Sequence, residues 1–276
     1  MRIVKILLIA ASILLLSCGR EELDSLPVYF ISGGQVYSID FDGGNLKRLT
    51  NDANTYESVS SSLDGEDILL SDSSGKMYLM NYKGGTPVYF MDGKNGTYGP
   101  SGNIYFAVKS GSYHNIMAKC SPDGSNVFHL KTMLSTTDIL SLSCSMDETE
   151  LAIHYWQSGP TYSAKMDLST LSDPVTIANG GVKQAYFPLN NDLLAYADTT
   201  LRIIHSDATY NDIYSFAYGT ISTAPALSPD GQYIFFCNNA PDPKEIKRLK
   251  IDTSEEVILG YINTSVSAFC VLGKPR

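Results

Sequence analysis

The histidines of this sequence are the first candidates for catalysis or metal binding, and their spacing argues against both. They lie in four separate segments, without an HxH or HExxH motif, at His114, His129, His154 and His205. Transition-metal sites usually include closely spaced ligand pairs of that kind. The pattern therefore favours histidines on the surface or within strands, and it predicts no metal site.

Three other kinds of chemistry also lack their signatures. No GxSxG motif occurs, so the exposed nucleophilic serine of an α/β-hydrolase is not encoded. The stretch DFDGGN (40–45) starts like a calcium loop but lacks the downstream bidentate glutamate. The arginines beyond the N-terminal segment are too few and too scattered to form a sialidase-type cluster. We therefore name no catalytic residue, expect no cofactor, and do not predict an enzyme.

Cysteine chemistry stays open at this stage. Apart from Cys18, the sequence contains Cys120, Cys144, Cys237 and Cys270. An exported protein can oxidise such residues, and four cysteines allow three different pairings. None of the four recurs at a fixed position of the repeats described below, so buried free thiols are an equally good interpretation.

Composition limits the class of protein. The chain has 276 residues, of which 43% are hydrophobic and 18% are charged, enough apolar material for a large core. Lysine and arginine total 20 against 29 aspartates and glutamates, without runs of like charge. Nucleic-acid binding needs a basic surface, so we expect no nucleic-acid partner.

The first residues have the layout of an export signal. Arg2 and Lys5 precede an apolar run (6–16) that is too short to span a bilayer, and Cys18 follows directly. This segment resembles a bacterial lipoprotein signal, with Leu15, Ser17 and Cys18 matching the lipobox and Leu16 departing from it. The resemblance implies a signal peptide at 1–17, lipid attachment at Cys18 and a short tether at 18–26. An ordinary signal with a chance cysteine is the alternative.

The rest of the chain is repetitive. Polar turns such as SPDG, each followed by an apolar run, recur along it, and the first apolar residues after the turns are Val28, Ile68, Ile104, Leu151, Leu193 and Ile234. The intervals of 40, 36, 47, 42 and 41 residues fall in the range of propeller or solenoid repeats. Each unit continues through two further short runs separated by glycine-rich or aspartate-rich turns, which predicts four strands per unit.

These motifs resemble the TolB-type, WD-repeat-like β-propeller repeat over residues 27–273, although Glu148 and Asn191 replace the turn glycine in two units. The resemblance implies an all-β, six-bladed β-propeller at 27–276, with four-stranded antiparallel blades around a central channel. Such folds often serve binding proteins of the bacterial envelope. The stretch AFCVLG (268–273) aligns with ALSPDG (226–231), so we predict that this C-terminal strand pairs with VYFIS (28–32) and closes the ring.

Strand direction indicates which connections share a rim. Because neighbouring strands are antiparallel, the links between second and third strands and the links between blades lie on the same rim. Those links contain the aromatic residues and the histidine that we propose as binding candidates, namely Tyr56, Tyr98, Tyr113, His114, Trp156 and Tyr162. Neighbouring blades should bring the loops of Tyr113 and Trp156 side by side. The alternative for Trp156 is a position packed inside the interface between blades.

The functional hypothesis is an exported propeller, lipid-anchored to a bacterial membrane on its periplasmic or surface face, that binds a protein partner as a non-catalytic scaffold. The alternative is a propeller that binds or cleaves carbohydrate with aromatic and acidic rim residues. Fold alone does not decide between them.

The lipid anchor can be tested directly. Replacing Cys18 with Ser removes the acceptor thiol, so we expect the protein to move from the membrane fraction to the soluble fraction, as measured by fractionation and immunoblotting. Retention on membranes after a high-salt wash would point to a different anchor.

Overall fold

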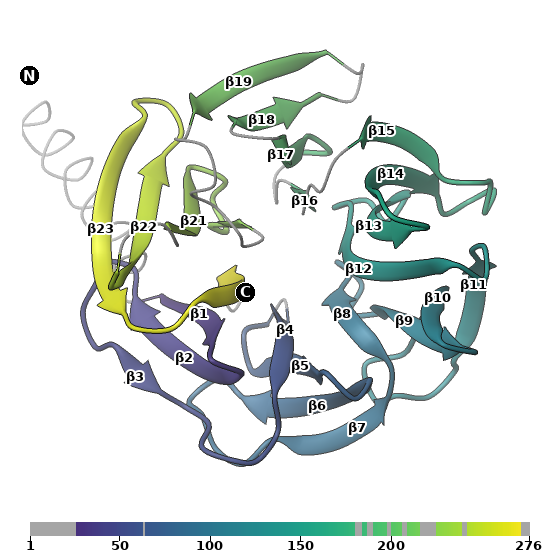
Figure 1. The fold of residues 1–276 in the computed structure, drawn as a ribbon, viewed down its shortest axis with the longest axis horizontal. Helices are drawn as coiled ribbons and strands as arrows, with labels where there is room; N and C mark the ends of the chain where they lie inside the picture. Colours follow the sequence, from purple (N-terminus) through teal and green to yellow (C-terminus); the bar gives the residue numbers. More distant parts are fainter. Residues whose placement is uncertain are drawn as a thin grey trace, which may run out of the picture.

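The computed structural model describes residues 26–62, 64–179, 184–186, 190–197, 200–205, 209–215, 225–238 and 242–271. The predicted signal peptide, Cys18 and almost all of the predicted tether lie outside these residues. Six four-stranded antiparallel sheets follow one another around a ring, as Figure 1 shows. We number these blades 1 to 6 in chain order and give their strands from the ring axis outward.

The first three blades use the N-terminal half of the chain, except that the innermost strand of blade 1 comes from the C-terminal part. Blade 1 consists of β24 (Val266–Val271), β1 (Pro27–Ser32), β2 (Gln35–Asp40) and β3 (Lys47–Arg48). Blade 2 consists of β4 (Tyr56–Ser61), β5 (Asp67–Asp72), β6 (Lys76–Asn81) and β7 (Val88–Asp92). Blade 3 consists of β8 (Lys94–Tyr98), β9 (Ile104–Ser110), β10 (Tyr113–Cys120) and β11 (Phe128–Thr132).

The other three blades repeat this order. Blade 4 consists of β12 (Thr137–Cys144), β13 (Glu150–Gln157), β14 (Thr161–Asp167) and β15 (Val175–Asn179). Blade 5 consists of β16 (Gln184–Tyr186), β17 (Leu193–Ala197), β18 (Thr200–Ile204) and β19 (Tyr210–Ser215). Blade 6 consists of β20 (Ala226–Leu227), β21 (Tyr233–Asn238), β22 (Lys244–Lys250) and β23 (Glu255–Ile262). The predicted six-bladed propeller is therefore confirmed.

The recurring SPDG-like motif is a turn braced by its own side chains. In blade 2 the Ser62 hydroxyl donates to Asp64 Oδ1 at 2.6 Å, and the same carboxylate oxygen accepts the backbone N–H of Glu66 at 3.1 Å. Ser145 with Asp147, and Ser228 with Asp230, make the same hydrogen bonds in blades 4 and 6. Serine and aspartate at this spacing hold the first two strands of a blade in register, which explains why the motif recurs.

The two units that lack the turn glycine make contacts between blades instead. Glu148 occupies the left-handed region with a φ of 54°, where glycine stands in blades 2 and 6. Its Oε1 accepts hydrogen bonds from the backbone N–H and hydroxyl of Ser101 in blade 3, at 2.8 and 2.6 Å. Asn191 Nδ2 donates to Asp147 Oδ2 at 2.6 Å, which joins blade 5 to blade 4.

The ring closes where the sequence predicted. Strand β24 pairs antiparallel with β1, so that Val271 lies opposite Val28 and Phe269 opposite Phe30. The Phe30 and Phe269 rings pack with their centroids 5.6 Å apart, inside a core cluster shared by blades 1 and 6. The innermost strand of blade 1 therefore comes from the other end of the described chain.

A second contact secures the same seam. Arg248 on β22 of blade 6 donates from Nη1 to the backbone carbonyl of Phe41 in blade 1 at 2.8 Å. Its guanidinium also lies 4.6 Å from the Phe41 ring centroid and 5.1 Å from that of Tyr233. A guanidinium between two aromatic rings combines cation–π attraction with burial of its apolar stem.

The structure supports buried free thiols, rather than disulfides, for the four cysteines of the domain. Cys120, Cys144, Cys237 and Cys270 are all free and buried. Burial raises the pKa of the Cys120 thiol to about 11 and that of Cys237 to about 12. Such thiols are protonated at neutral pH and act as small apolar side chains of the core.

Removing an aromatic ring from the closing strand should destabilise the whole ring. Phe269 is 6% exposed, and Phe269→Ala is expected to lower the free energy of unfolding by about 3–5 kcal/mol, the usual range for a buried phenylalanine. Urea unfolding followed by circular dichroism measures this change. Tyr261→Ala, at a side chain that is 54% exposed, is the control and should stay within about 0.5 kcal/mol. Equal stability of the two variants would contradict the role of β24.

Candidate functional site

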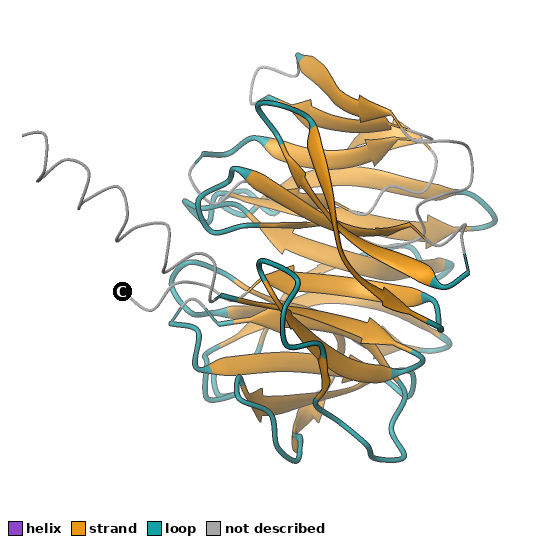
Figure 2. Ribbon diagram, turned by 90° about the vertical axis from the view of Figure 1, so that its left-hand side faces the viewer, coloured by secondary structure: helices purple, strands orange, loops and turns teal. Residues whose placement is uncertain are grey.

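The two ends of the blade strands form two different rims. The rim that carries the links between second and third strands and the links between blades is called the loop rim here. The opposite rim, with the turns between first and second strands and between third and outer strands, is called the turn rim. Figure 2 shows the ring from the side, with connections at both ends of the strands.

Two of the predicted binding residues are not in loops. Tyr56 is the first residue of β4 and is 1% exposed, with its hydroxyl donating to Asp52 Oδ2 at 2.8 Å. Tyr98 is the last residue of β8 and is half-buried. Burial raises the pKa of both phenols. The predicted loop position is therefore wrong for both residues, because Tyr56 is buried at the start of β4 and the segment 94–98 pairs with β9 as the innermost strand of blade 3. Their role in binding stays a prediction.

Tyr113 and Trp156 do meet at the loop rim. Tyr113 begins β10 of blade 3, and Trp156 is the second-to-last residue of β13 in blade 4. Their ring centroids are 5.8 Å apart and the rings are tilted by 33°. Both side chains are half-buried, so part of each remains accessible to solvent. The predicted approach of the two loops is confirmed, whereas Tyr162 stacks on Tyr155 within blade 4.

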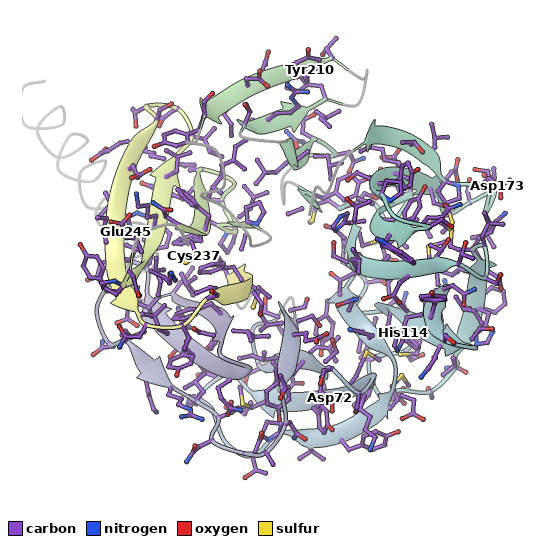
Figure 3. The ribbon with its side chains drawn as sticks, in the orientation of Figure 1. Asp72, His114, Asp173, Tyr210, Cys237 and Glu245 are labelled. Carbon is purple, nitrogen blue, oxygen red and sulfur yellow. The ribbon has the colours of Figure 1, made fainter. Side chains whose placement is uncertain are left out.

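His114, next to Tyr113 in blade 3, contacts the neighbouring blades on both sides. Its backbone N–H donates to Asp138 Oδ1 of β12 at 2.8 Å, and its ring Nδ1 lies 3.5 Å from the same oxygen. On the other side, its ring packs closely against Gly75 of blade 2. A Cβ added to Gly75 would lie only 2.6 Å from His114 Nε2. This residue, labelled in Figure 3, therefore contacts both blades that flank its own.

The electrostatic surroundings favour an ionised Asp138. Burial alone would raise the pKa of this carboxyl, but the hydrogen bonds from the His114 ring and backbone, with the nearby charges of His114 and Lys94, lower it below its usual value. Lys94 in turn forms an ion pair with Glu57 of blade 2 at 2.6 Å. A line of alternating charges thus joins blades 2, 3 and 4 beside Tyr113 and Trp156.

The link between blades 3 and 4 adds a residue that the sequence analysis did not single out. Leu134 is 64% exposed, and its carbonyl accepts hydrogen bonds from the Asn115 side chain at 3.3 Å and the Thr137 backbone at 2.9 Å. We call Tyr113, Leu134 and Trp156 the rim patch. The apolar pair Met133 and Leu134, directly before the polar residues 135–137, was the signal that could have revealed it.

Groups suited to reaction chemistry are not assembled here. Within the described ranges, no group of three or more histidine, cysteine, aspartate or glutamate side chains could hold a metal ion. Asp42 of the calcium-like stretch accepts the Gly44 N–H at 2.9 Å and Asp40 accepts the Asn45 amide at 2.6 Å, as expected for a turn. The part of the chain that the structure covers contains no helix with the length and apolarity to cross a membrane.

A cavity of about 410 Å³ lies at the turn-rim end of β6 and β7 in blade 2, away from the rim patch. Asp67, Asn81, Gly85, Val88 and Tyr89 are among the residues that line it. Burial, with the charges of Asp64 and Glu66, raises the pKa of Asp67. A single carboxylate without a base or nucleophile beside it forms no reaction centre, so this cavity does not compete with the rim patch.

Fold and site together define a six-bladed β-propeller whose best candidate site is an aromatic binding surface at one rim. No family model matches the sequence, and neither does any curated protein. Solved structures do resemble the fold. TolB from Acinetobacter baumannii superposes with a TM-score of 0.71 at 12% identity, over 90% of this chain and 66% of its own. A TolB from Agrobacterium tumefaciens gives 0.68 at 12% identity, over 90% of this chain and 97% of its own.

A third similar structure comes from a nidogen/laminin complex. It has a TM-score of 0.70 at 10% identity and covers 91% of this chain and all of its own. At such identities the likeness concerns the fold. The TolB-type architecture inferred from the repeat motifs is thereby confirmed.

The charge on Asp138 should stabilise the fold in a pH-dependent way. Because its pKa is lowered in the folded state, the stabilisation is present above the unfolded pKa of about 3.9 and is lost as the pH falls through the folded value. Asp138→Asn should therefore cost about 1 kcal/mol at pH 7, and less as the pH falls below about 4, in urea melts of both proteins. The control Asp173→Asn changes a carboxylate that is 91% exposed and should have little effect at any pH. A difference for Asp138→Asn that grows below pH 3 would contradict this account.

Proposed function

We propose that this chain is an exported lipoprotein, anchored through Cys18, whose propeller binds a protein partner at the rim patch and performs no reaction. In this proposal residues 1–17 form the signal peptide, 18–26 the tether and 27–276 the binding domain. The mature protein acts on the periplasmic or surface side of a bacterial membrane.

The observation that carries the proposal is the Tyr113–Trp156 pair, together with the exposed Leu134 in the link between the same two blades. Rigid aromatic rings with one accessible side lose little conformational entropy on binding, and tryptophan and tyrosine dominate the hot spots of protein interfaces. The contacts of His114 with blades 2 and 4 hold the pair in place before a partner arrives. Such preorganisation reduces the entropic cost of association.

The similar structures support the proposal at the level of the scaffold. One of them is part of a nidogen/laminin complex, an assembly of proteins. The TolB structures supply the bacterial examples of the same ring.

Carbohydrate is the second candidate partner. Aromatic rings with an accessible face also stack on sugars, and the Trp156 and Tyr113 rings offer such a surface beside the Asp138 carboxylate. An oligogalacturonate lyase in complex with manganese resembles the fold with a TM-score of 0.54 at 14% identity, over 86% of this chain and 73% of its own. Glycan arrays probed with the soluble domain would show binding that depends on Trp156 if this candidate is correct.

A site-specific cross-link tests the protein partner. With a photo-reactive residue in place of Leu134, irradiation of intact cells should give one discrete protein adduct, and the same probe at Val88 on the outer wall should not. Adding Trp156→Ala should weaken binding of the identified partner by about 2 kcal/mol, or roughly 30-fold in Kd, the scale of a hot-spot residue.

The control for this substitution is Tyr210→Ala, at an exposed aromatic residue on the outer wall of blade 5 (Figure 3). It should leave partner binding unchanged. Loss of thermal stability in Trp156→Ala with unchanged binding by the folded fraction would instead make Trp156 a residue of the blade interface, and it would overturn the proposed site.

A further inference from the structure

We infer that the propeller is held with its turn rim towards the anchoring membrane and its loop rim towards the aqueous compartment. The partner of the rim patch is therefore a protein that approaches from solution or from an opposing surface, rather than one embedded in the same bilayer. The inference rests on the proposed anchor at Cys18, and it concerns the class of partner that the proposed site can reach.

The first step is the place at which the chain enters the ring. Pro27, the first residue of β1, pairs with Asp40 beside the turn between β2 and β3. The neighbouring Val28 pairs with Val271 at the end of β24. Ser32, at the other end of β1, is followed by the loop-rim turn to β2. The chain therefore enters blade 1 at the turn rim.

An inter-blade hydrogen bond confirms this direction. The Tyr29 hydroxyl, two residues after the entry point, donates to the carbonyl of Tyr82 at 2.7 Å. Tyr82 lies just after β6, in the connection to the outer strand β7 of blade 2. That connection belongs to the turn rim.

The second step is the reach of the tether. Eight residues lie between Cys18 and Pro27, and the nine Cα–Cα steps of this fully extended segment span at most about 30 Å. A six-residue strand such as β1 spans roughly 20 Å from one rim to the other. Blade 4, which carries Trp156, lies across the ring from blade 1 (Figure 1). Running along the outer wall of blade 1 to the loop rim would use most of this reach, and too little remains to bring the rim patch on blades 3 and 4 against the membrane.

The third step is the charge of the turn rim. The aspartates that brace its turns stay ionised at neutral pH, because hydrogen bonds to neighbouring hydroxyl and backbone groups lower the pKa of Asp64, Asp123, Asp147 and Asp167. Anionic lipid headgroups repel such a surface across a Debye length of about 8–10 Å. This repulsion keeps the turn rim from adsorbing to the bilayer, so the place at which the tether enters blade 1, and not the charge of the rim, sets the orientation.

Two fluorophores in one blade test the orientation. Ser125 lies in the turn-rim connection between β10 and β11 of blade 3, and Ser112 lies in the loop-rim turn between β9 and β10. Both are exposed, and the four native cysteines of the domain are buried, so maleimide dyes will label Ser125→Cys and Ser112→Cys selectively. The labelled, full-length lipidated proteins are reconstituted into phosphatidylethanolamine and phosphatidylglycerol vesicles that contain a headgroup-labelled acceptor.

Energy transfer to the acceptor should be at least about twofold more efficient from the Ser125→Cys label than from the Ser112→Cys label, given rims roughly 20 Å apart. A 20-residue flexible insert before Leu26 should lower both efficiencies and remove the difference. Flotation with the vesicles but equal transfer, or stronger transfer from the Ser112→Cys label, would overturn the orientation alone. Failure of the lipidated protein to float would overturn the anchor, and the orientation with it.

Discussion

Closure of the ring by β24 is the constraint on which the rest of the structure depends. A propeller blade packs on a neighbour on each side, so a ring that stays open leaves two blade faces and a set of backbone hydrogen bonds unsatisfied. The pairing of Phe269 with Phe30 and the contact of Arg248 with Phe41 satisfy both requirements at one seam. The rim patch depends on this closure, because it is formed by two neighbouring blades whose relative positions the closed ring fixes.

Small polar side chains near the ring axis also fix the positions of neighbouring blades. The hydroxyl of Ser61 on β4 donates to the carbonyl of Val271 on β24 at 2.9 Å, so that blade 2 holds the closing strand. Ser143 on β12 accepts the backbone N–H of Tyr186 on β16 at 3.1 Å, which joins blade 4 to blade 5. Serine hydroxyls are short enough to reach a neighbouring backbone where the innermost strands converge. His114 does at the loop rim what these serines do near the axis, and the rim patch is rigid for that reason.

The sequence predicted the parts of this architecture that depend on repetition. Turn motifs at near-constant intervals predicted six blades, and the alignment of 268–273 with 226–231 predicted the closing strand. The innermost strand β8 was missed because one glycine inside it and one on each side made the segment 92–99, with the predicted loop residue Tyr98, resemble a loop. The structure explains those glycines by crowding, since a Cβ on Gly96 would lie 2.5 Å from the Leu69 side chain and one on Gly93 would lie 2.7 Å from Phe106. Pairwise distances of this kind are set by tertiary packing, which a single sequence does not reveal.

The other exposed apolar side chains recur from blade to blade, whereas the rim patch does not. Val88, Phe128, Val175 and Tyr210 are exposed at the start of successive outer strands, so they belong to the repeat itself. The outer strands of blades 2 to 6 carry a register shift against the third strand, and bulges of this kind discourage pairing between sheet edges. Tyr113 and Trp156 have no equivalent pair at the described positions of the other blades. A feature that the repeat does not require, on the rim where connections are free to vary, is where a binding function can be added without disturbing the ring.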